Sequence, residues 1–244
     1  FEVYRGEHQV PPEVYRSQRT RYLLALLAAH AGRPVAEDLL MEAFWSDKPD
    51  KARSNLWSAA SYLRRHLRPE GWEGPLDYVV RGPDGLMLNP KLPRWHDLDE
   101  FDRSAQEAAR HRARNQVEPE LECLKRLVQL HRAPYLEGYY ADWAIQIRNR
   151  VEATLMDAFT RLSVELVRLG RPREALEYAT RALELDPCQQ EVTLAAMQAQ
   201  VALQNPVEAI RLYQRCTRVL RKELGIEPTI AIEEMHQRAR LILP

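Results

Sequence analysis

Residues 53–67 read RSNLWSAASYLRRHL, and the spacing of their leucines predicts a helix with two different faces. At about 100° per residue, Leu56, Ala60, Leu63 and Leu67 fall on one narrow stripe, which predicts the buried side. Serine, alanine and arginine make up much of the remainder. A helix that only fills a core does not need this composition on its other side, so that side indicates a contact.

The side opposite the leucines carries small hydroxyl groups and positive charge. Its residues are Ser54, Ser58, Ser61, Tyr62 and Arg65. Small side chains let a helix backbone approach the floor of a DNA major groove, where a hydroxyl can bond to a base edge. A flank between the two faces consists of Arg53, Trp57, Arg64 and Arg68. Arginines in that position can contact phosphates and set the register of the helix. The alternative is a merely solvated polar face, which is common on helices.

Length and charge limit the classes of protein that fit. The chain has 244 residues, enough for two domains, and 35 basic against 35 acidic residues. A net charge of zero disfavours a protein that coats polyanions generally, but it allows one local basic face. Segment 50–68 is such a face, because Asp50 stands alone against five basic side chains: Lys51, Arg53, Arg64, Arg65 and Arg68.

Three further observations concern the cell compartment and the extent of the chain. No segment reaches transmembrane length, so we expect a cytoplasmic protein. Cys123, Cys188 and Cys216 lie far apart and outside any CxxC pair, which favours free thiols in a reducing compartment. The chain starts with Phe1 instead of Met, and we therefore expect it to be a fragment.

In the part of the chain before residues 53–67, the spacing of apolar residues is that of a strand in some segments and that of a helix in others. FEVYRGEHQV (1–10) alternates like a strand with a turn at 5–7. A helix capped by Ser17 and ended by Gly32 should bury a face with Tyr22, Leu23, Leu26 and Leu27. A short second helix within 36–45 should point Leu39, Leu40, Ala43 and Phe44 inward.

A turn at SDKPDKA (46–52) precedes the third helix, which should close near Pro69. In LDYVVRGPDGLMLNP (76–90), apolar runs flank GPDG, where Pro83 and Gly85 suit turn positions, and this predicts a β-hairpin. A strand, three helices and a hairpin form the order of a winged helix-turn-helix. Three arginines crowd the start of the first helix, where the macrodipole disfavours cations: Arg16, Arg19 and Arg21. Their position favours an external anion such as a phosphate, and Arg81 on the hairpin could serve as the DNA contact of a wing.

The second part of the chain is helical throughout. A linker at NPKLPRWHD (89–97) separates it, and short breaks with Pro or Gly separate its helices. The predicted helices are 97–113, 120–130, 141–169, 172–185, 189–203, 207–224 and 230–241. A shift of 34 residues aligns Pro172 with Pro206, Ala175 with Ala209, and Ala182 with Cys216. That period is the length of a tetratricopeptide (TPR) repeat.

The motifs resemble a known family. SQRTRYLLALLAAHAGRPVAEDLLMEAFW (17–45) and ARSNLWSAASYLRRHL (52–67) resemble an OmpR-type winged helix-turn-helix, as found in Streptomyces antibiotic regulatory proteins (SARPs). The second part resembles the bacterial transcriptional activator domain (BTAD). The segments that carry this second resemblance are DLDEFDRSAQEA (97–108), LVQLHRAPYLEGYYADWA (127–144), EALEYATRALELDP (174–187) and AIRLYQRCTRVLRKELGIEP (209–228).

The resemblance implies a mostly α protein. It places a winged helix-turn-helix domain at 1–92 and an all-α TPR-like domain at 95–244. It also implies that helix 53–67 reads the major groove of double-stranded DNA, usually at direct repeats, and that the helical domain supports dimerisation and contacts RNA polymerase. The expected DNA-binding residues are Arg53, Ser54, Trp57, Ser58, Ser61, Tyr62, Arg64, Arg65, Arg81, Arg19 and Arg21.

Other functions find less support in the sequence. It lacks the GxSxG, HExxH, GxGxxG and GxxxxGK[ST] motifs, so we expect neither an enzyme nor a cofactor or metal. The aromatic side chains of YLEGYYADW (135–143) could form a ligand cage, but a cluster that pins a loop onto the helical array is the favoured interpretation. Two alternatives stay open. One is a protein-interaction scaffold, and the other is a sensor whose helical domain binds a small molecule.

Overall fold

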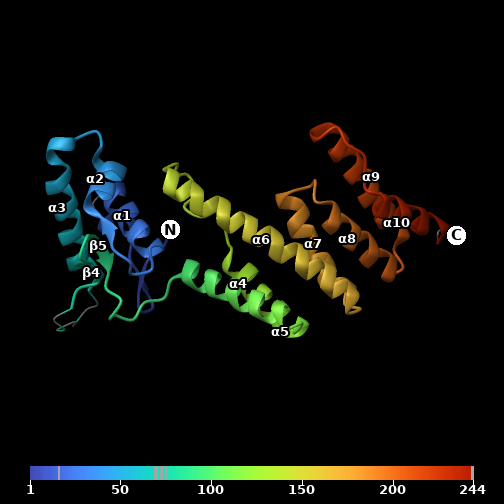
Figure 1. Cartoon of the computed structure of the whole chain (residues 1–244), viewed down its shortest axis with the longest axis horizontal. Coiled ribbons are helices and arrows are strands. Elements are labelled where there is room, and N and C mark those ends of the chain that lie inside the picture. Colours follow the sequence, from blue (N-terminus) through green and yellow to red (C-terminus); the bar gives the residue numbers. More distant parts are fainter. Residues whose placement is uncertain (16, 69–70, 72–73, 75, 243–244) are drawn as a thin grey trace. The chain divides into compact units, whose positions relative to one another are not determined.

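The computed structural model describes residues 1–15, 17–68, 71, 74 and 76–242. The chain divides into two compact units. The first comprises Phe1–Glu100 and Gly138–Asp142, and the second comprises Phe101–Glu137 and Trp143–Pro244. Small sheets occur in the first unit and helices make up the second, as Figure 1 shows by its labels.

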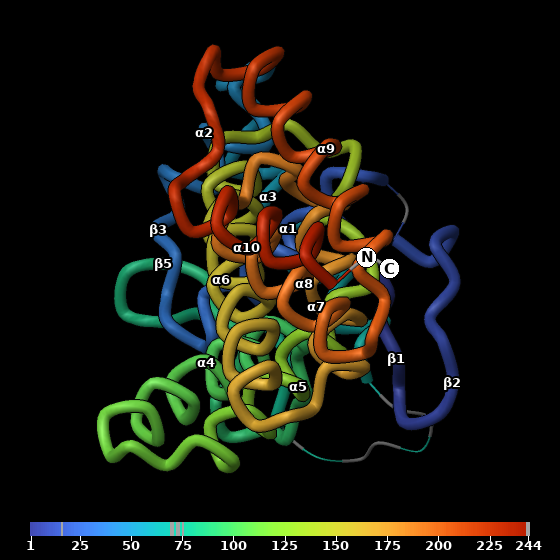
Figure 2. Tube along the Cα trace, turned by 90° about the vertical axis from the view of Figure 1, so that its right-hand side faces the viewer, coloured from blue at the N-terminus to red at the C-terminus, as the bar shows by residue number. Residues whose placement is uncertain are grey.

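A small hairpin opens the first unit. Strands β1 (Tyr4–Arg5) and β2 (His8–Gln9) pair antiparallel around Gly6, whose φ of 60° suits a residue without Cβ. Figure 2 shows the two strands side by side. A 3-10 turn, η1 (Pro12–Tyr15), leads to helix α1 (Gln18–Ala29). Ser17 caps α1 as predicted, because its hydroxyl accepts a hydrogen bond from the backbone amide of Thr20.

The end and the buried face of α1 match the expectation in part. Leu23, Leu26 and Leu27 are buried, whereas Tyr22 is only half-buried. The helix ends at Ala29, and Gly32 follows it with a φ of 79°. Gly32 therefore belongs to the turn after the helix.

Helix α2 (Glu37–Trp45) buries a narrower face than expected. Leu40 and Phe44 are buried, but Leu39 is 60% exposed and Ala43 also faces solvent. The inward placement of Leu39 and Ala43 is thus wrong. Each lies about 100° around the helix from its buried neighbour, on the side away from the core.

Helix α3 (Pro49–Leu67) is longer at its start than predicted. Pro49 stands in its first turn, where the missing amide of proline costs no hydrogen bond, so residues 49–52 extend the helix instead of forming a turn. The predicted closure near Pro69 lies outside the described residues. Leu56, Ala60 and Leu63 of the predicted core stripe are at most 1% exposed, whereas its fourth member, Leu67, is only half-buried.

A three-stranded sheet completes the first unit. Strand β5 (Gly85–Leu88) lies between β3 (Val35–Ala36) and β4 (Val79–Arg81), and both pairings are antiparallel. The predicted hairpin is therefore present as β4 and β5, and β3 is an addition that the sequence analysis lacks. Gly85 starts β5 and also closes the predicted turn, because its carbonyl oxygen accepts a hydrogen bond of 2.7 Å from the backbone amide of Gly82. A Cβ at Gly85 would meet the carbonyl oxygen of Val35 at 1.8 Å, so the pairing with β3 requires glycine there.

The second unit consists of helices that lie close to the predicted ranges. They are α4 (Asp97–Ala113), α5 (Val117–Leu130), α6 (Asp142–Arg168), α7 (Pro172–Leu185), α8 (Gln190–Ala202), α9 (Pro206–Glu223) and α10 (Ile230–Leu241). Helices α7 to α10 follow one another as neighbouring rods, as Figure 1 shows, and α8 packs against α7, α9 and α10.

The 34-residue repeat corresponds to equivalent packing positions in α7 and α9. Pro172 and Pro206 each stand in the first turn of their helix. Ala175 and Ala209, one turn further on, are at most 1% exposed. Ala182 and Cys216 are also matched and buried, and this supports the interpretation of Cys216 as a core residue.

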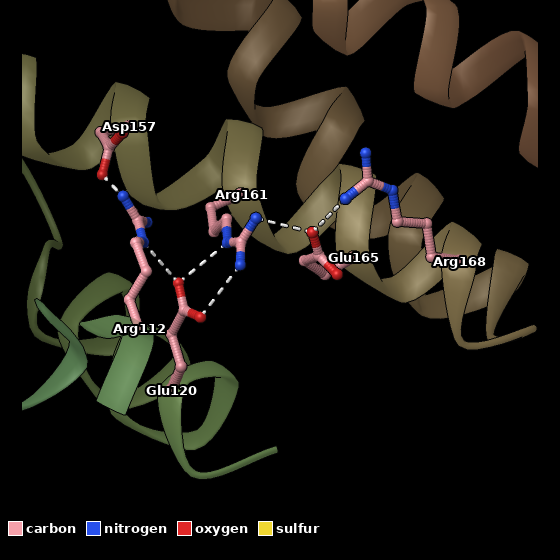
Figure 3. Close-up of polar contacts among 6 residues, drawn as sticks. All are labelled: Arg112, Glu120, Asp157, Arg161, Glu165 and Arg168. Atoms are coloured by element: carbon pink, nitrogen blue, oxygen red, sulfur yellow. Dashed lines mark hydrogen bonds and ion pairs between the residues drawn. The ribbon is translucent and has the colours of Figure 1, made fainter. Parts of the chain in front are cut away.

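An ion-pair network joins α4, α5 and α6 (Figure 3). The carboxylate of Glu120 is 1% exposed and accepts hydrogen bonds from Arg161 at 2.8 and 3.1 Å and from Arg112 at 2.7 Å. Arg161 also donates to Glu165 at 2.6 Å. Burial by itself would raise the pKa of Glu120, but the hydrogen bonds from Arg161 and Arg112 outweigh it and lower the pKa below its ordinary value.

The aromatic side chains before α6 are not one cluster. Tyr139 stacks on Tyr22 of α1, with ring centroids 3.7 Å apart, and both belong to the first unit. Tyr140 is 77% exposed. The expectation of a cluster that pins this loop onto the helical array is therefore wrong for Tyr139 and Tyr140, because the partner of Tyr139 comes from the winged helix-turn-helix.

Candidate nucleic-acid interface

The exposed face of α3 is the candidate site. Ser54, Ser58, Ser61 and Arg65 are all exposed, on the side of the helix opposite the buried leucines. Lys51, in the first turn, is exposed as well. The rigid core contact on one side and the small hydroxyl groups on the other give a helix that can approach a groove closely without rearrangement.

Two arginines, Arg64 of the flank and Arg81 of the hairpin, converge on the ring of Trp57. The guanidinium of Arg81, at the end of β4, lies 5.1 Å from the ring centroid, and that of Arg64 lies 5.8 Å from it. Both distances are within the range of cation–π contacts. The contact of Arg81 with Trp57 links the hairpin to α3, so these two elements meet at this ring.

Arg64 has a second, internal contact. Its Nε donates a hydrogen bond of 2.8 Å to the backbone carbonyl oxygen of Val79 in β4, and the side chain is half-buried. A guanidinium held at Nε keeps its terminal nitrogens for other acceptors. Arg64 therefore supports the hairpin in the free protein, besides lying next to the candidate face.

Tyr62 is placed at the margin of the exposed face. Its ring is half-buried and stacks on that of His66, with centroids 3.9 Å apart. Nδ1 of His66 lies 2.9 Å from the carbonyl oxygen of Tyr62. The two side chains hold each other along the helix, so Tyr62 presents an ordered edge.

A carboxylate that the sequence analysis did not identify lies among these arginines. Glu37, the first residue of α2, has its Oε1 3.1 Å from Arg81 and its Oε2 3.8 Å from Arg53. Its side chain is 14% exposed, whereas those of Arg53 and Arg81 are 73% and 69% exposed. No spacing in the sequence signals this arrangement, because its three members come from α2, α3 and β4.

The arginines at the start of α1 have partners within the protein. Arg19 forms an ion pair of 3.0 Å with Asp47, and Arg21 donates a hydrogen bond to the carbonyl oxygen of Phe1. The position of Arg19 therefore does not by itself indicate an external anion, because the carboxylate of Asp47 supplies negative charge within the protein. Arg16 lies outside the described residues.

Comparison with known proteins identifies the family. A model of the bacterial transcriptional activator domain matches residues 96–240, more than half of the chain. The chain belongs to this family. A second model, of the C-terminal domain of transcriptional regulatory proteins, matches residues 12–82. These two domains in this order make the chain a transcriptional regulator of the SARP type.

Curated relatives agree with this assignment. The regulator is 25% identical to the transcriptional regulatory protein MoaR1 of Mycobacterium tuberculosis, over 93% of its own length and 73% of MoaR1. It is 29% identical to the regulatory protein AfsR of Streptomyces coelicolor, over 91% of its own length but only 22% of AfsR.

A solved structure shares the fold. It is that of Mycobacterium tuberculosis EmbR in complex with a low-affinity phosphopeptide, and it superposes with a TM-score of 0.74 at 21% identity. The match covers 97% of the regulator and 62% of the EmbR chain. The regulator thus has the fold of a winged helix-turn-helix followed by TPR-like helices.

The described residues contain neither a candidate metal site nor a candidate membrane span. Among them, no group of three or more His, Cys, Asp or Glu side chains could hold a metal ion. None of the helices within the described part of the chain is both long and apolar enough to cross a membrane.

Proposed function

We propose that this regulator activates transcription by inserting α3 into the major groove of operator DNA, with Arg81 of the hairpin as the wing contact. The observation that carries the proposal is the exposed serine and arginine face on a helix whose opposite side is buried in the core. Serine hydroxyls can bond to base edges, and an arginine can bond bidentately to guanine.

The residues divide into base-reading and phosphate-contacting groups. Ser54, Ser58, Ser61 and Arg65 face the bases in this proposal, with Tyr62 at the edge of the contact. The flank of α3 and the hairpin contact the phosphates in this proposal, because phosphate contacts position a protein on DNA while base contacts specify the sequence. This second group consists of Arg53, Trp57, Arg64 and Arg81.

Arg19 and Arg21 belong at the margin of the proposed interface. To reach a phosphate, they would have to leave Asp47 and the carbonyl oxygen of Phe1. Such an exchange of partners gains less than a contact by an unpaired arginine, so we assign them a minor share of the affinity.

The helical domain supplies the protein contacts in this proposal. Its stacked helical hairpins form the kind of extended surface on which repeat proteins bind partners. We assign to residues 95–244 homodimerisation on direct repeats and contact with RNA polymerase, and to residues 1–92 the DNA contact. A regulator that acts on the chromosome of a bacterium works in the cytoplasm.

The proposal can be tested by selecting bound sequences from a random duplex library and then titrating salt on the selected operator. We expect an enriched repeated motif and an affinity that falls with salt, with about five to eight phosphates neutralised per subunit. The protein-to-DNA ratio at saturation then reports dimerisation on the operator. Absence of any enriched motif would favour the scaffold alternative.

The first variant is Arg65→Ala. Because Arg65 is exposed on the base-facing side, its loss should weaken operator binding by about 1–3 kcal/mol, a factor of about 5 to 150, and relax the preference at one base pair. Arg110→Ala is the matched control, since Arg110 is an exposed arginine on α4. Equal operator affinities for both variants would contradict the recognition-helix assignment.

A further inference from the structure

We propose that Glu37 is a positioning residue that couples the wing to the recognition helix and raises the discrimination between operator and non-specific DNA. The inference deepens the proposed function and rests on it, because it assumes that Arg53 and Arg81 contact phosphates. Glu37 carries a negative charge, as the phosphates of DNA do. A search for DNA-binding side chains therefore does not select it.

Glu37 holds two arginines with one carboxylate. Each of its two oxygens faces a different guanidinium, at 3.1 Å for Arg81 and 3.8 Å for Arg53. The carboxylate is largely shielded from solvent, whereas the two guanidinium groups remain mostly exposed. Glu37 thus lies behind the arginines, and their free nitrogens remain available to an incoming phosphate.

The position of Glu37 in the backbone makes this support rigid. It is the first residue of α2, where the helix dipole favours a negative charge, and Ala36 before it provides no side-chain cap. The strand β3, which ends at Ala36, pairs with β5 of the hairpin. The carboxylate is therefore anchored next to the sheet that carries Arg81.

Trp57 restricts Arg81 from a second direction. The guanidinium of Arg81 lies 5.1 Å from the centroid of the Trp57 ring and also bonds to Glu37. An arginine that is already ordered loses less conformational freedom when it binds a phosphate. Removal of Glu37 would take from Arg81 its ion pair, with the Trp57 ring contact kept, and would take from Arg53 the carboxylate that it faces.

The charge of Glu37 works against non-specific binding. Two arginines and one carboxylate have a smaller net positive charge than two arginines alone, and non-specific affinity follows the number of phosphates that a protein neutralises. A specific complex also benefits from the preset geometry of the arginines. The same carboxylate therefore lowers non-specific affinity, while the preset geometry of the two arginines raises operator affinity.

The test compares Glu37→Gln with Asp38→Asn in the full chain. Gln has nearly the shape of Glu without its charge, and Asp38 is an exposed acidic residue in the same turn of α2. For Glu37→Gln we expect about three-fold tighter binding to a random duplex and a salt slope steeper by about one. The ratio of operator to random affinity should fall about ten-fold. Asp38→Asn should leave the slope unchanged and the ratio within about two-fold.

A double-mutant cycle shows whether the effect passes through the wing. In an Arg81→Ala background, Glu37→Gln should change the ratio of operator to random affinity much less than in the parent, because one of the two arginines it holds is absent. Thermal unfolding of each variant, read from circular dichroism, identifies any change that comes from loss of fold.

The outcomes separate this inference from the proposed function. If the parent protein binds no duplex selectively, both are overturned. If the parent binds its operator and Glu37→Gln behaves like Asp38→Asn, only the role of Glu37 is overturned. An unchanged effect of Glu37→Gln in the Arg81→Ala background would overturn the coupling between wing and helix.

Discussion

At the scale of single residues, arginine has two different uses in this regulator. Arg65 is exposed on the candidate DNA face, whereas Arg64, its neighbour, donates to the carbonyl oxygen of Val79. In the second unit, Arg161 holds the buried Glu120 by two hydrogen bonds. The planar guanidinium of arginine suits both uses, because some of its N–H groups can bind one acceptor while the others remain available to a second acceptor.

The Glu120 network should make the helical unit sensitive to acid. The pKa of Glu120 lies below its ordinary value of 4.5, so its ionised form stabilises the fold above that pH. The contribution is lost as the pH falls below 4.5 and through the lowered pKa. Glu120→Gln should cost about 2 kcal/mol at pH 7, less than a fully buried pair because both arginines retain solvent contact.

Urea unfolding, followed by circular dichroism at pH 7 and at acid pH, measures this effect. The difference in stability between parent and Glu120→Gln should shrink as the pH falls. Glu122→Gln serves as control, because Glu122 is exposed on the same helix and pairs with Lys125 at 3.0 Å. Its cost should stay below about 0.5 kcal/mol. A similar cost for both variants would contradict a special role for Glu120.

At the scale of elements, the wing depends on a close approach of backbones. Gly85 begins β5 and faces the backbone of Val35 in β3, where a methyl group has no room. The same sheet carries Arg81 through the pairing of Arg81 with Leu86. The position of the proposed wing contact is therefore tied to a glycine on the neighbouring strand.

Gly85→Ala should destabilise the first unit by about 2 kcal/mol, since overpacking against a backbone forces the strands apart. It should weaken operator binding while leaving the helical unit intact. Pro83→Ala, at an exposed position of the same hairpin, is the matched control and should change stability by less than about 1 kcal/mol. Hydrogen exchange, read separately for residues 1–100 and 143–242, distinguishes the two units. Equal protection of β3 and β5 in both variants would contradict this account.

At the scale of the whole molecule, sequence order and compact units differ. Residues Gly138–Asp142, between α5 and α6, count with the winged helix-turn-helix and not with the helices that flank them. Within this unit, Tyr139 stacks on Tyr22 of α1. A protein cut after residue 92 would therefore lack part of its own first unit.

Tyr139→Ala should lower the stability of the first unit. The loss of the stacked aromatic pair should contribute about 1 kcal/mol, in addition to the free energy lost with the buried apolar area. Tyr140→Ala, at the exposed neighbour, should change it little. Hydrogen exchange of α1 measures the difference. If the two variants protect α1 equally, the stack does not contribute to the unit.

The sequence by itself determined the elements whose causes are local. Helical periods and Pro breaks place α4 to α10 within a few residues, Ser17 marks the start of α1, and the leucine spacing of residues 53–67 separates the two faces of α3. These features depend on residues within one or two turns of each other, which a linear pattern records directly.

Only the tertiary structure decided which long-range partners the side chains take. Glu37 pairs with Arg81, Asp47 pairs with Arg19, and Tyr139 stacks on Tyr22. The two members of each pair are too far apart in the sequence for a helical or strand period to relate them. The exposure of Leu39 likewise depends on which row of a short helix faces the core. Such contacts arise when elements pack against one another, so residue type and spacing alone do not specify them.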